Sequence, residues 1–159
     1  MTRSTVAPLD RTLTHRLHTL HKLSDRVSQA AYLESARMPM SEGRCLAAIG
    51  AFEPMSVNDL ARGANLNKGQ ASRAAQVLVD QGLVRKGANG DDARGVVLTL
   101  TAKGRQQWQR VMLLIERRNR EIFGILSDAE RAHFGDMLDR LIAQARSDLA
   151  VGDEPAESR

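Results

Sequence analysis

The sequence has very little of what marks several common protein classes. Its one cysteine, Cys45, cannot form an intrachain disulfide, which excludes a disulfide-stapled secreted scaffold. No apolar run approaches the roughly 18 residues of a membrane-spanning helix. The first ten residues lack the apolar core of a signal peptide and the arginine content of a transit peptide. These absences predict a cytoplasmic protein with no membrane partner.

Aromatic residues are also scarce. They make up 3% of the chain, whereas apolar residues make up 42%, so leucine, valine, isoleucine and alanine must build the core. A core of that kind favours helices. A chain of 159 residues buries roughly 70% of its unfolded surface, so it needs neither a disulfide nor a structural metal to fold.

Sequence motifs for catalysis are missing as well. The chain contains no glycine-rich phosphate loop, no nucleophile elbow and no histidine–glutamate metal motif. We therefore expect a protein that is not an enzyme and that carries no cofactor.

Charge is unevenly distributed along the chain. The net charge is +4, but residues 151–159 hold three acids against one arginine, so the rest of the chain carries +6. This acidic, proline-containing tail is predicted to be disordered. A basic body favours a polyanionic partner.

Apolar residues at three- and four-residue steps predict a mainly α-helical fold with one β-hairpin. Four residues, Ser56, Asn67, Thr101 and Ser127, stand where helix N-caps are expected. In the hairpin, Asn89-Gly90 is followed by further loop residues to Gly95, which favours an extended loop over a two-residue turn. The expected helices are 9–36, 41–52, 57–64, 68–81, 102–124 and 128–149, with the hairpin between 83 and 101.

The helix predicted over 68–81 has two unlike faces. Its inward face consists of small residues, Ala71 and Ala74 or Ala75, followed by Leu78, which would allow close packing on the preceding helix. The outward face has no acid before Asp80, and its polar groups can reach base edges and phosphates. Two short helices and a hairpin form the plan of a winged helix-turn-helix. An ordinary solvated helix face is the alternative. The predicted DNA contacts of this helix and its cap are Asn67, Lys68, Gln70, Ser72, Arg73 and Gln76.

The hairpin loop offers a second predicted contact. Arg94 near the tip suits insertion into a narrow minor groove. Asp91 and Asp92 would repel DNA if unpaired, so we expect one of them, with Asp92 as the candidate, to hold Arg94 extended. The alternative is a surface turn with a weak local ion pair.

Four segments of the chain resemble the MarR (multiple antibiotic resistance regulator) family of bacterial transcription factors. Residues 66–73 are similar to the start of its recognition helix, and 81–86 to the exit from that helix into the wing. Asp92-Ala93-Arg94 and the Leu-Thr-x-x-Gly pattern within 98–104 are similar to its wing and the following helix entry. The helix order matches over residues 9–149. The chain departs from many members at Gly69-Gln70, where they have a Ser-Thr pair.

The resemblance implies a homodimer that binds pseudopalindromic double-stranded DNA, in the bacterial cytoplasm and on the nucleoid when bound. It divides the chain into a helical dimerisation region, 1–36 and 102–150, and a winged helix-turn-helix domain, 37–101, before the tail. Most such proteins are repressors that a small molecule releases, often an aromatic carboxylate or a phenol. The residues support a dimer independently, because the first and last helices carry more apolar surface than one small domain can cover.

Four residues are candidates for effector binding. Arg16 falls on the apolar side of the first helix, where it could form an ion pair or hold a carboxylate in a bidentate contact. Arg44 lies where the family's effector pocket is expected, and His18 and His21 could contact a ligand or an interface.

Two other switches are weighed against this hypothesis. His15, His18 and His21 follow one another on a helix, but zinc needs three or four ligands and only His133 remains, so we expect no metal site. Cys45 lies within an apolar helix and is interpreted as a small core residue rather than a redox sensor. The alternatives kept open are a redox- or metal-switched regulator on the same fold and a winged-helix module that binds protein.

Overall fold

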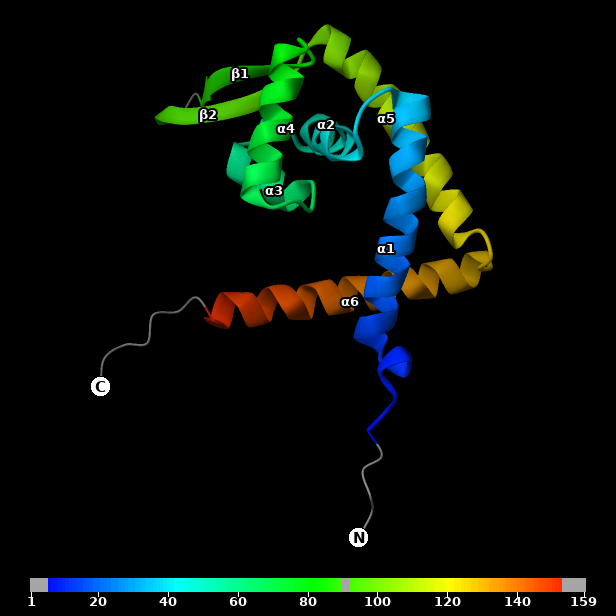
Figure 1. Cartoon of the computed structure of the whole chain (residues 1–159). Helices are drawn as coiled ribbons and strands as arrows, with labels where there is room; N and C mark the ends of the chain where they lie inside the picture. Colours follow the sequence, from blue (N-terminus) through cyan, green and yellow to red (C-terminus); the bar gives the residue numbers. More distant parts are fainter. Residues whose placement is uncertain (1–5, 90–91, 153–159) are drawn as a thin grey trace, which may run out of the picture. The chain divides into compact units, whose positions relative to one another are not determined.

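The computed structural model describes residues 6–89 and 92–152, and it is mostly helical with one hairpin (Figure 1). This confirms the predicted fold class. The chain divides into two compact units, residues 1–118 and 119–159. The elements are η1 (Leu9–Arg11), α1 (Leu13–Ala31), η2 (Tyr32–Ala36), α2 (Met40–Phe52), α3 (Val57–Gly63), α4 (Lys68–Asp80), β1 (Val84–Asn89), β2 (Asp92–Leu100), α5 (Ala102–Phe123) and α6 (Asp128–Gly152).

None of the helices in the described ranges has the length and the apolar run that crossing a bilayer requires.

All four expected helix caps are present. The hydroxyl of Ser56 accepts the Asp59 N–H at 3.1 Å, and that of Thr101 accepts the Gly104 N–H at 2.9 Å. Ser127 and Glu130 satisfy each other's backbone N–H groups reciprocally. These short-range hydrogen bonds supply partners for the unpaired N–H groups of the first helical turn, which is why the sequence fixes these starts locally.

The first helix differs from the prediction of one element over 9–36. Thr12 is extended and separates η1 from α1, because its side chain caps α1 by accepting the His15 N–H at 3.4 Å. At the other end, η2 is one π-helical stretch that stops where Arg37 takes a left-handed conformation, with φ 54°. Pro39 then precedes α2.

The core of the first unit forms where α4 packs on α2 and α3. The predicted inward face is buried, and both of its alternatives belong to it: Ala71, Ala74, Ala75 and Leu78 are all buried. Their largest buried neighbours are Leu46, Ile49, Leu60 and Leu98, and Cys45 is fully buried among them, as expected. The small alanine side chains let α4 approach closely, so its opposite face must point outward.

The hairpin differs from the prediction, which placed an extended loop between its strands. The strands pair as far as Asn89 with Asp92, so only two residues separate this last pair. The next pair is Ala88 with Val96, which leaves residues 93–95 as an irregularity in β2. The extra residues that we assigned to a long loop are therefore accommodated within a strand, as in a β-bulge.

Several contacts fasten α5 to the winged-helix elements. The Glu53 carboxylate accepts the Leu100 N–H at 2.6 Å and pairs with Arg105. The indole of Trp108 donates to the Ala47 carbonyl at 3.2 Å. Gly104 lies so close to the Leu83 carbonyl that a methyl group there would overlap it.

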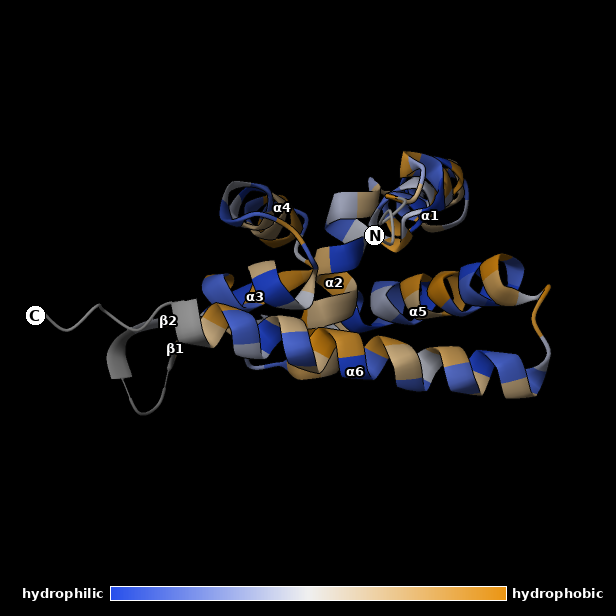
Figure 2. Ribbon diagram, turned by 90° about the horizontal axis from the view of Figure 1, so that it is seen from below, coloured by the Kyte–Doolittle hydropathy of each residue, from blue (hydrophilic) through white to orange (hydrophobic). Residues whose placement is uncertain are grey.

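The predicted apolar stripe of α1 remains uncovered in the single chain. Leu13, Leu17, Leu20, Leu23 and Val27 are 43% to 72% exposed. Figure 2 shows the apolar and polar residues of this helix by colour. The predicted homodimer would cover the stripe, and it stays a prediction.

In the second unit, α6 begins at the cap formed by Ser127 and is exposed over most of its length. The rings of Phe123 and Phe134 lie 6.0 Å apart and link the end of α5 to α6. Helix α6 continues to Gly152, slightly beyond its predicted end, and the rest of the predicted disordered tail lies outside the described residues.

The close approach at Gly104 yields a stability prediction. Gly104→Ala should lower the free energy of unfolding by roughly 2 kcal/mol or more, because the new methyl group would meet rigid backbone rather than a side chain that can move away. The matched control is Gly87→Ala on β1, where nothing lies within 4 Å of the added carbon. Urea denaturation measures both variants, and equal stabilities would contradict this packing.

Candidate nucleic-acid interface

Helix α4 presents a polar face to solvent. Lys68, Gln70, Ser72, Arg73 and Gln76 are all exposed, opposite the buried alanines. The first turn of α4 contains no acid, and its N-terminal N–H groups add partial positive charge at the same end. The face can therefore donate hydrogen bonds to phosphates and to base edges.

Two of the predicted contact residues also form the cap of α4. The Asn67 side chain accepts the Gln70 N–H at 2.8 Å, and the Gln70 side-chain oxygen accepts the Asn67 N–H at 3.3 Å. This reciprocal box holds the Gln70 amide across the start of the helix, with its NH₂ group left as a donor. The sequence predicted the Asn67 cap but not the second half of the box.

Gln76 joins α4 to the hairpin. Its NH₂ group donates to Asp80 at 2.8 Å, and its oxygen accepts from the Lys86 ammonium at 2.7 Å. Both ends of the amide are thus engaged within the protein, although the sequence placed Gln76 among the DNA contacts. That contact stays a prediction, whereas the joint between α4 and β1 is present.

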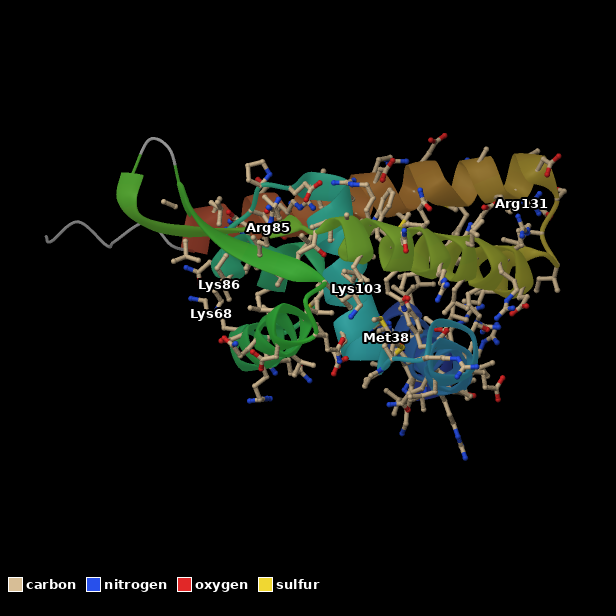
Figure 3. All side chains as sticks on the ribbon, turned by 90° about the horizontal axis from the view of Figure 1, so that it is seen from above. Met38, Lys68, Arg85, Lys86, Lys103 and Arg131 are labelled. Carbon is tan, nitrogen blue, oxygen red and sulfur yellow. The ribbon has the colours of Figure 1, made fainter. Side chains whose placement is uncertain are left out.

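Strand β1 adds basic residues that the sequence analysis missed. Arg85 and Lys86 are exposed on β1, and Figure 3 shows them with Lys68 of α4. The pattern of residues 83–101 indicated strands and a turn, and the charge of the first strand was not considered. Together with Lys68 they extend the positive charge from α4 to the hairpin.

A hollow of about 610 Å³ lies between α3 and the start of α4. Asn58, Arg62 and Lys68 line it, together with Asp59, whose carboxylate accepts from the Ser56 hydroxyl and pairs with Arg62. These two contacts hold the pKa of Asp59 below its usual value, the serine hydrogen bond contributing most. Asp59 is therefore ionised and already paired, which moderates its repulsion of a polyanion.

The predicted contacts at the hairpin tip cannot be placed as side chains. The backbone of Asp92 and Arg94 runs in β2, but their side chains lie outside the described residues, as does Asp91 entirely. Arg94 as a minor-groove contact and Asp92 as its support stay predictions.

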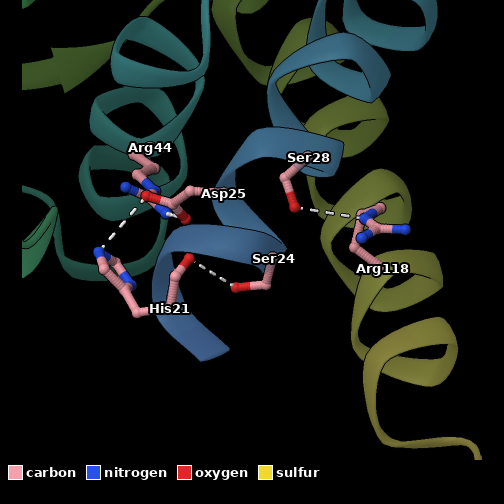
Figure 4. Close-up of polar contacts among 6 residues, drawn as sticks. All are labelled: His21, Ser24, Asp25, Ser28, Arg44 and Arg118. Carbon is pink, nitrogen blue, oxygen red and sulfur yellow. Dashed lines mark hydrogen bonds and ion pairs between the residues drawn. The ribbon is translucent and has the colours of Figure 1, made fainter. Parts of the chain in front are cut away.

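Two of the four effector candidates lie in one cluster, joined by an acid that the sequence analysis overlooked. The Arg44 guanidinium pairs with Asp25 at 2.5 Å, and the His21 Nε2 lies 3.5 Å from the other Asp25 oxygen (Figure 4). The signal for Asp25 was available, since it stands four residues after His21 on the same helix.

Arg16 and His18 are not part of this cluster. Arg16 is exposed, so its expected position on a buried side is not found in the single chain. The reason is that the neighbouring leucines of α1 are themselves uncovered. His18 is exposed as well.

Arg44 also lines a cavity of about 250 Å³ between α2, the end of α3 and α5. The walls are mostly apolar, with Ala47, Phe52, Met112 and Ile115 among them. A half-buried guanidinium at the edge of an apolar cavity suits the carboxylate of a small ring compound.

Neither a redox nor a metal switch gains support from the described residues. Burial raises the pKa of the Cys45 thiol to about 12, and the nearby Glu42 charge adds to this, so Cys45 stays a protonated thiol. No group of three or more histidine, cysteine or acidic side chains in the described ranges is arranged to hold a metal ion.

Comparison with known proteins agrees with this arrangement. Residues 38–95 match the model of the MarR family. Among curated proteins, none matches the chain in sequence.

Three solved structures share the fold. A MarR-family transcriptional regulator from Silicibacter pomeroyi is 20% identical, with 86% of this chain and 92% of that chain covered and a TM-score of 0.74. The DNA binding of BpsR from Bordetella bronchiseptica is regulated by 6-hydroxynicotinic acid. BpsR is 19% identical, with 86% of this chain and 96% of that chain covered and a TM-score of 0.75. Rv2887 from Mycobacterium tuberculosis, in complex with salicylic acid, is 24% identical, with 87% and 98% covered and a TM-score of 0.68.

One substitution at Gln70 can separate its role in the cap of α4 from its predicted contact with DNA. Gln70→Glu should keep the stability of the chain, because a glutamate at this position also accepts the Asn67 N–H. It should weaken binding to duplex DNA at least about tenfold, because it places a negative charge on the face that meets phosphates.

Urea denaturation and fluorescence anisotropy with labelled duplex measure the two effects. Gln109→Glu, at an exposed position of α5, is the matched control, with the same charge change on another element. Unchanged DNA affinity in Gln70→Glu would remove Gln70 from the interface.

Proposed function

We propose that this chain, whose winged-helix segment belongs to the MarR family, is a transcriptional regulator that binds double-stranded DNA and responds to a small ligand. The observation that carries the proposal is the polar, acid-free start of α4, held outward by a buried alanine face and flanked by the basic strand β1.

The DNA contacts divide into two kinds. Arg73, Gln70 and Ser72 would read or position the major groove, because arginine and glutamine can pair with base edges. Lys68, joined by Arg85 and Lys86, would bind mostly phosphates and contribute the salt-dependent part of the affinity. Arg94 would extend contact to the minor groove.

The active form in this proposal is a homodimer. The exposed leucines and valine of α1 form an apolar stripe that a second copy would cover. Two winged units related by a twofold axis would match a pseudopalindromic operator. The dimer without effector would be the form that binds DNA and represses transcription.

The proposed effector is a small aromatic acid or phenol in the cavity beside Arg44. BpsR and Rv2887 share the fold and are described with ring compounds that carry a carboxylate. In this chain the ligand carboxylate would compete with Asp25 for Arg44 and so disturb the link between α1 and α2. Helix α2 packs directly on α4, so a shift of α2 would reach the DNA-contacting face.

The two alternatives have weaker support. A redox switch at Cys45 is opposed by complete burial and a raised thiol pKa. A winged-helix module that binds protein would show no salt-dependent affinity for duplex DNA and would be indifferent to Arg73→Ala.

Lys68 gives the first test. Lys68→Ala should weaken binding to all duplexes to a similar degree and lower the slope of log affinity against log salt by about one unit, because one phosphate contact is lost. Anisotropy titrations at several salt concentrations measure this slope.

The matched control is Lys22→Ala, an exposed lysine on α1, which should leave the slope unchanged. If Lys68→Ala retains the affinity and slope of the parent protein, Lys68 contacts no phosphate.

Arg44 gives the second test. The double variant Asp25→Asn/Arg44→Gln replaces the ion pair by neutral groups of similar shape, so neither charge is left unpaired. It should bind salicylate at least about tenfold more weakly and lose the release of DNA by salicylate, while its DNA affinity without ligand stays the same. Calorimetry and anisotropy measure the two effects.

Asp128→Asn/Arg131→Gln, which neutralises both partners of an ion pair in α6, is the matched control. An Asp25→Asn/Arg44→Gln variant that still releases DNA in response to salicylate would show that the effector binds elsewhere.

A further inference from the structure

A second cavity lies in the first unit, apart from the Arg44 cavity and from the polar face of α4. It measures about 400 Å³ and forms where the end of η2, the end of α4 and the first turns of α5 meet. Three cations line it, Arg37, Lys103 and Arg110, and none of its described lining residues is an aspartate or glutamate. Glu42 lies behind the lining residue Gln81, to whose side chain it is hydrogen-bonded, and burial raises the pKa of its carboxyl group. Such an unbalanced concentration of positive charge in a concave site favours an anion.

Two of the polar side chains in this cavity hold its walls together. The Lys103 ammonium donates to the Gln81 carbonyl at 2.9 Å and so ties the start of α5 to the end of α4. The Gln107 amide donates to the Ala36 carbonyl at 2.6 Å and ties α5 to the end of η2. The cavity is therefore bounded by elements that are joined to each other.

The side chains of the other two cations, Arg37 and Arg110, do not hold the walls together. Within residues 6–89 and 92–152, no hydrogen bond or ion pair involves the guanidinium of Arg37 or Arg110. The backbone of Arg37 is held in place, because its N–H donates to the Tyr32 carbonyl and its left-handed conformation ends η2. A fixed backbone and an unpaired guanidinium leave the charge of Arg37 available to a ligand.

Part of the cavity lining is apolar. Met38 and Leu83 line it and are themselves only 4% and 5% exposed. Figure 3 labels Met38 and Lys103, which contribute an apolar and a cationic side chain to the same cavity. Cations and apolar side chains in one cavity suit a ligand with an oxyanion attached to a small hydrocarbon body.

We infer that this cavity is a binding site for a small organic anion, whose carboxylate or phosphate group is held by Arg37 and Arg110 above Met38 and Leu83. The site shares no lining residue with the Arg44 cavity. Its ligand would touch Gln81, the residue that ends α4. The inference does not rest on the proposed function, because binding can be measured without DNA.

The experiment uses the full chain with Arg44→Gln, which removes the cation of the other cavity. Isothermal titration calorimetry with benzoate and with phenyl phosphate separates a carboxylate ligand from a phosphate ligand, and neutral benzamide controls for the ring alone. We expect at least one of the two anions to bind and benzamide not to bind.

Arg37→Asn and Arg110→Gln are then added one at a time. Asparagine tolerates the left-handed conformation at position 37. Each change should lower the affinity for the anion about tenfold, because each removes a charge-assisted hydrogen bond. Arg110→Lys, which keeps the charge, should lose less affinity than Arg110→Gln, and circular dichroism confirms that each variant is folded.

Arg26→Gln is the matched control, since it removes one exposed positive charge from α1, outside the cavity. It should leave anion affinity unchanged. The inference is overturned if neither anion binds in the Arg44→Gln background, if benzamide binds as well as the anions, or if Arg26→Gln weakens binding as much as Arg37→Asn and Arg110→Gln do.

Discussion

The burial of one face of α4 decides which side of this helix meets solvent. Ala71, Ala74, Ala75 and Leu78 are each at most 5% exposed, and their contact with α2 and α3 fixes the rotation of the helix about its axis. With that rotation fixed, Lys68 and its polar neighbours must face outward. A larger residue on the alanine face would move α4 away from its support and displace all the predicted DNA contacts of this helix at once.

The joints around α4 explain how distant events could reach it. Gln76 connects the helix to β1 through Lys86, and Lys103 connects its end to α5 through the Gln81 carbonyl. The Arg44 cavity touches α2, which packs on α4, and the Arg37 cavity touches the end of α4 itself. Both proposed ligands would thus act on the same helix through direct packing, without a long chain of intermediates.

The sequence predicted what local interactions decide and missed what tertiary contacts decide. The caps at Ser56, Asn67, Thr101 and Ser127 and the buried face of α4 were predictable, because each depends on residues within about one turn. The joint between Gln76 and Lys86 was not, because it depends on how the hairpin folds back on α4. The sequence placed Arg16 on a buried side, since helical periodicity identifies an apolar face but does not reveal what covers it.

Selection of bound duplexes from a random library shows whether a twofold pair of α4 helices binds operator DNA. We expect enrichment of one motif with two inverted half-sites, their centres about one helical turn or a multiple of it apart, since a dimer places its recognition helices that way. Enrichment of no sequence, with binding that is the same for all duplexes or absent, would contradict it.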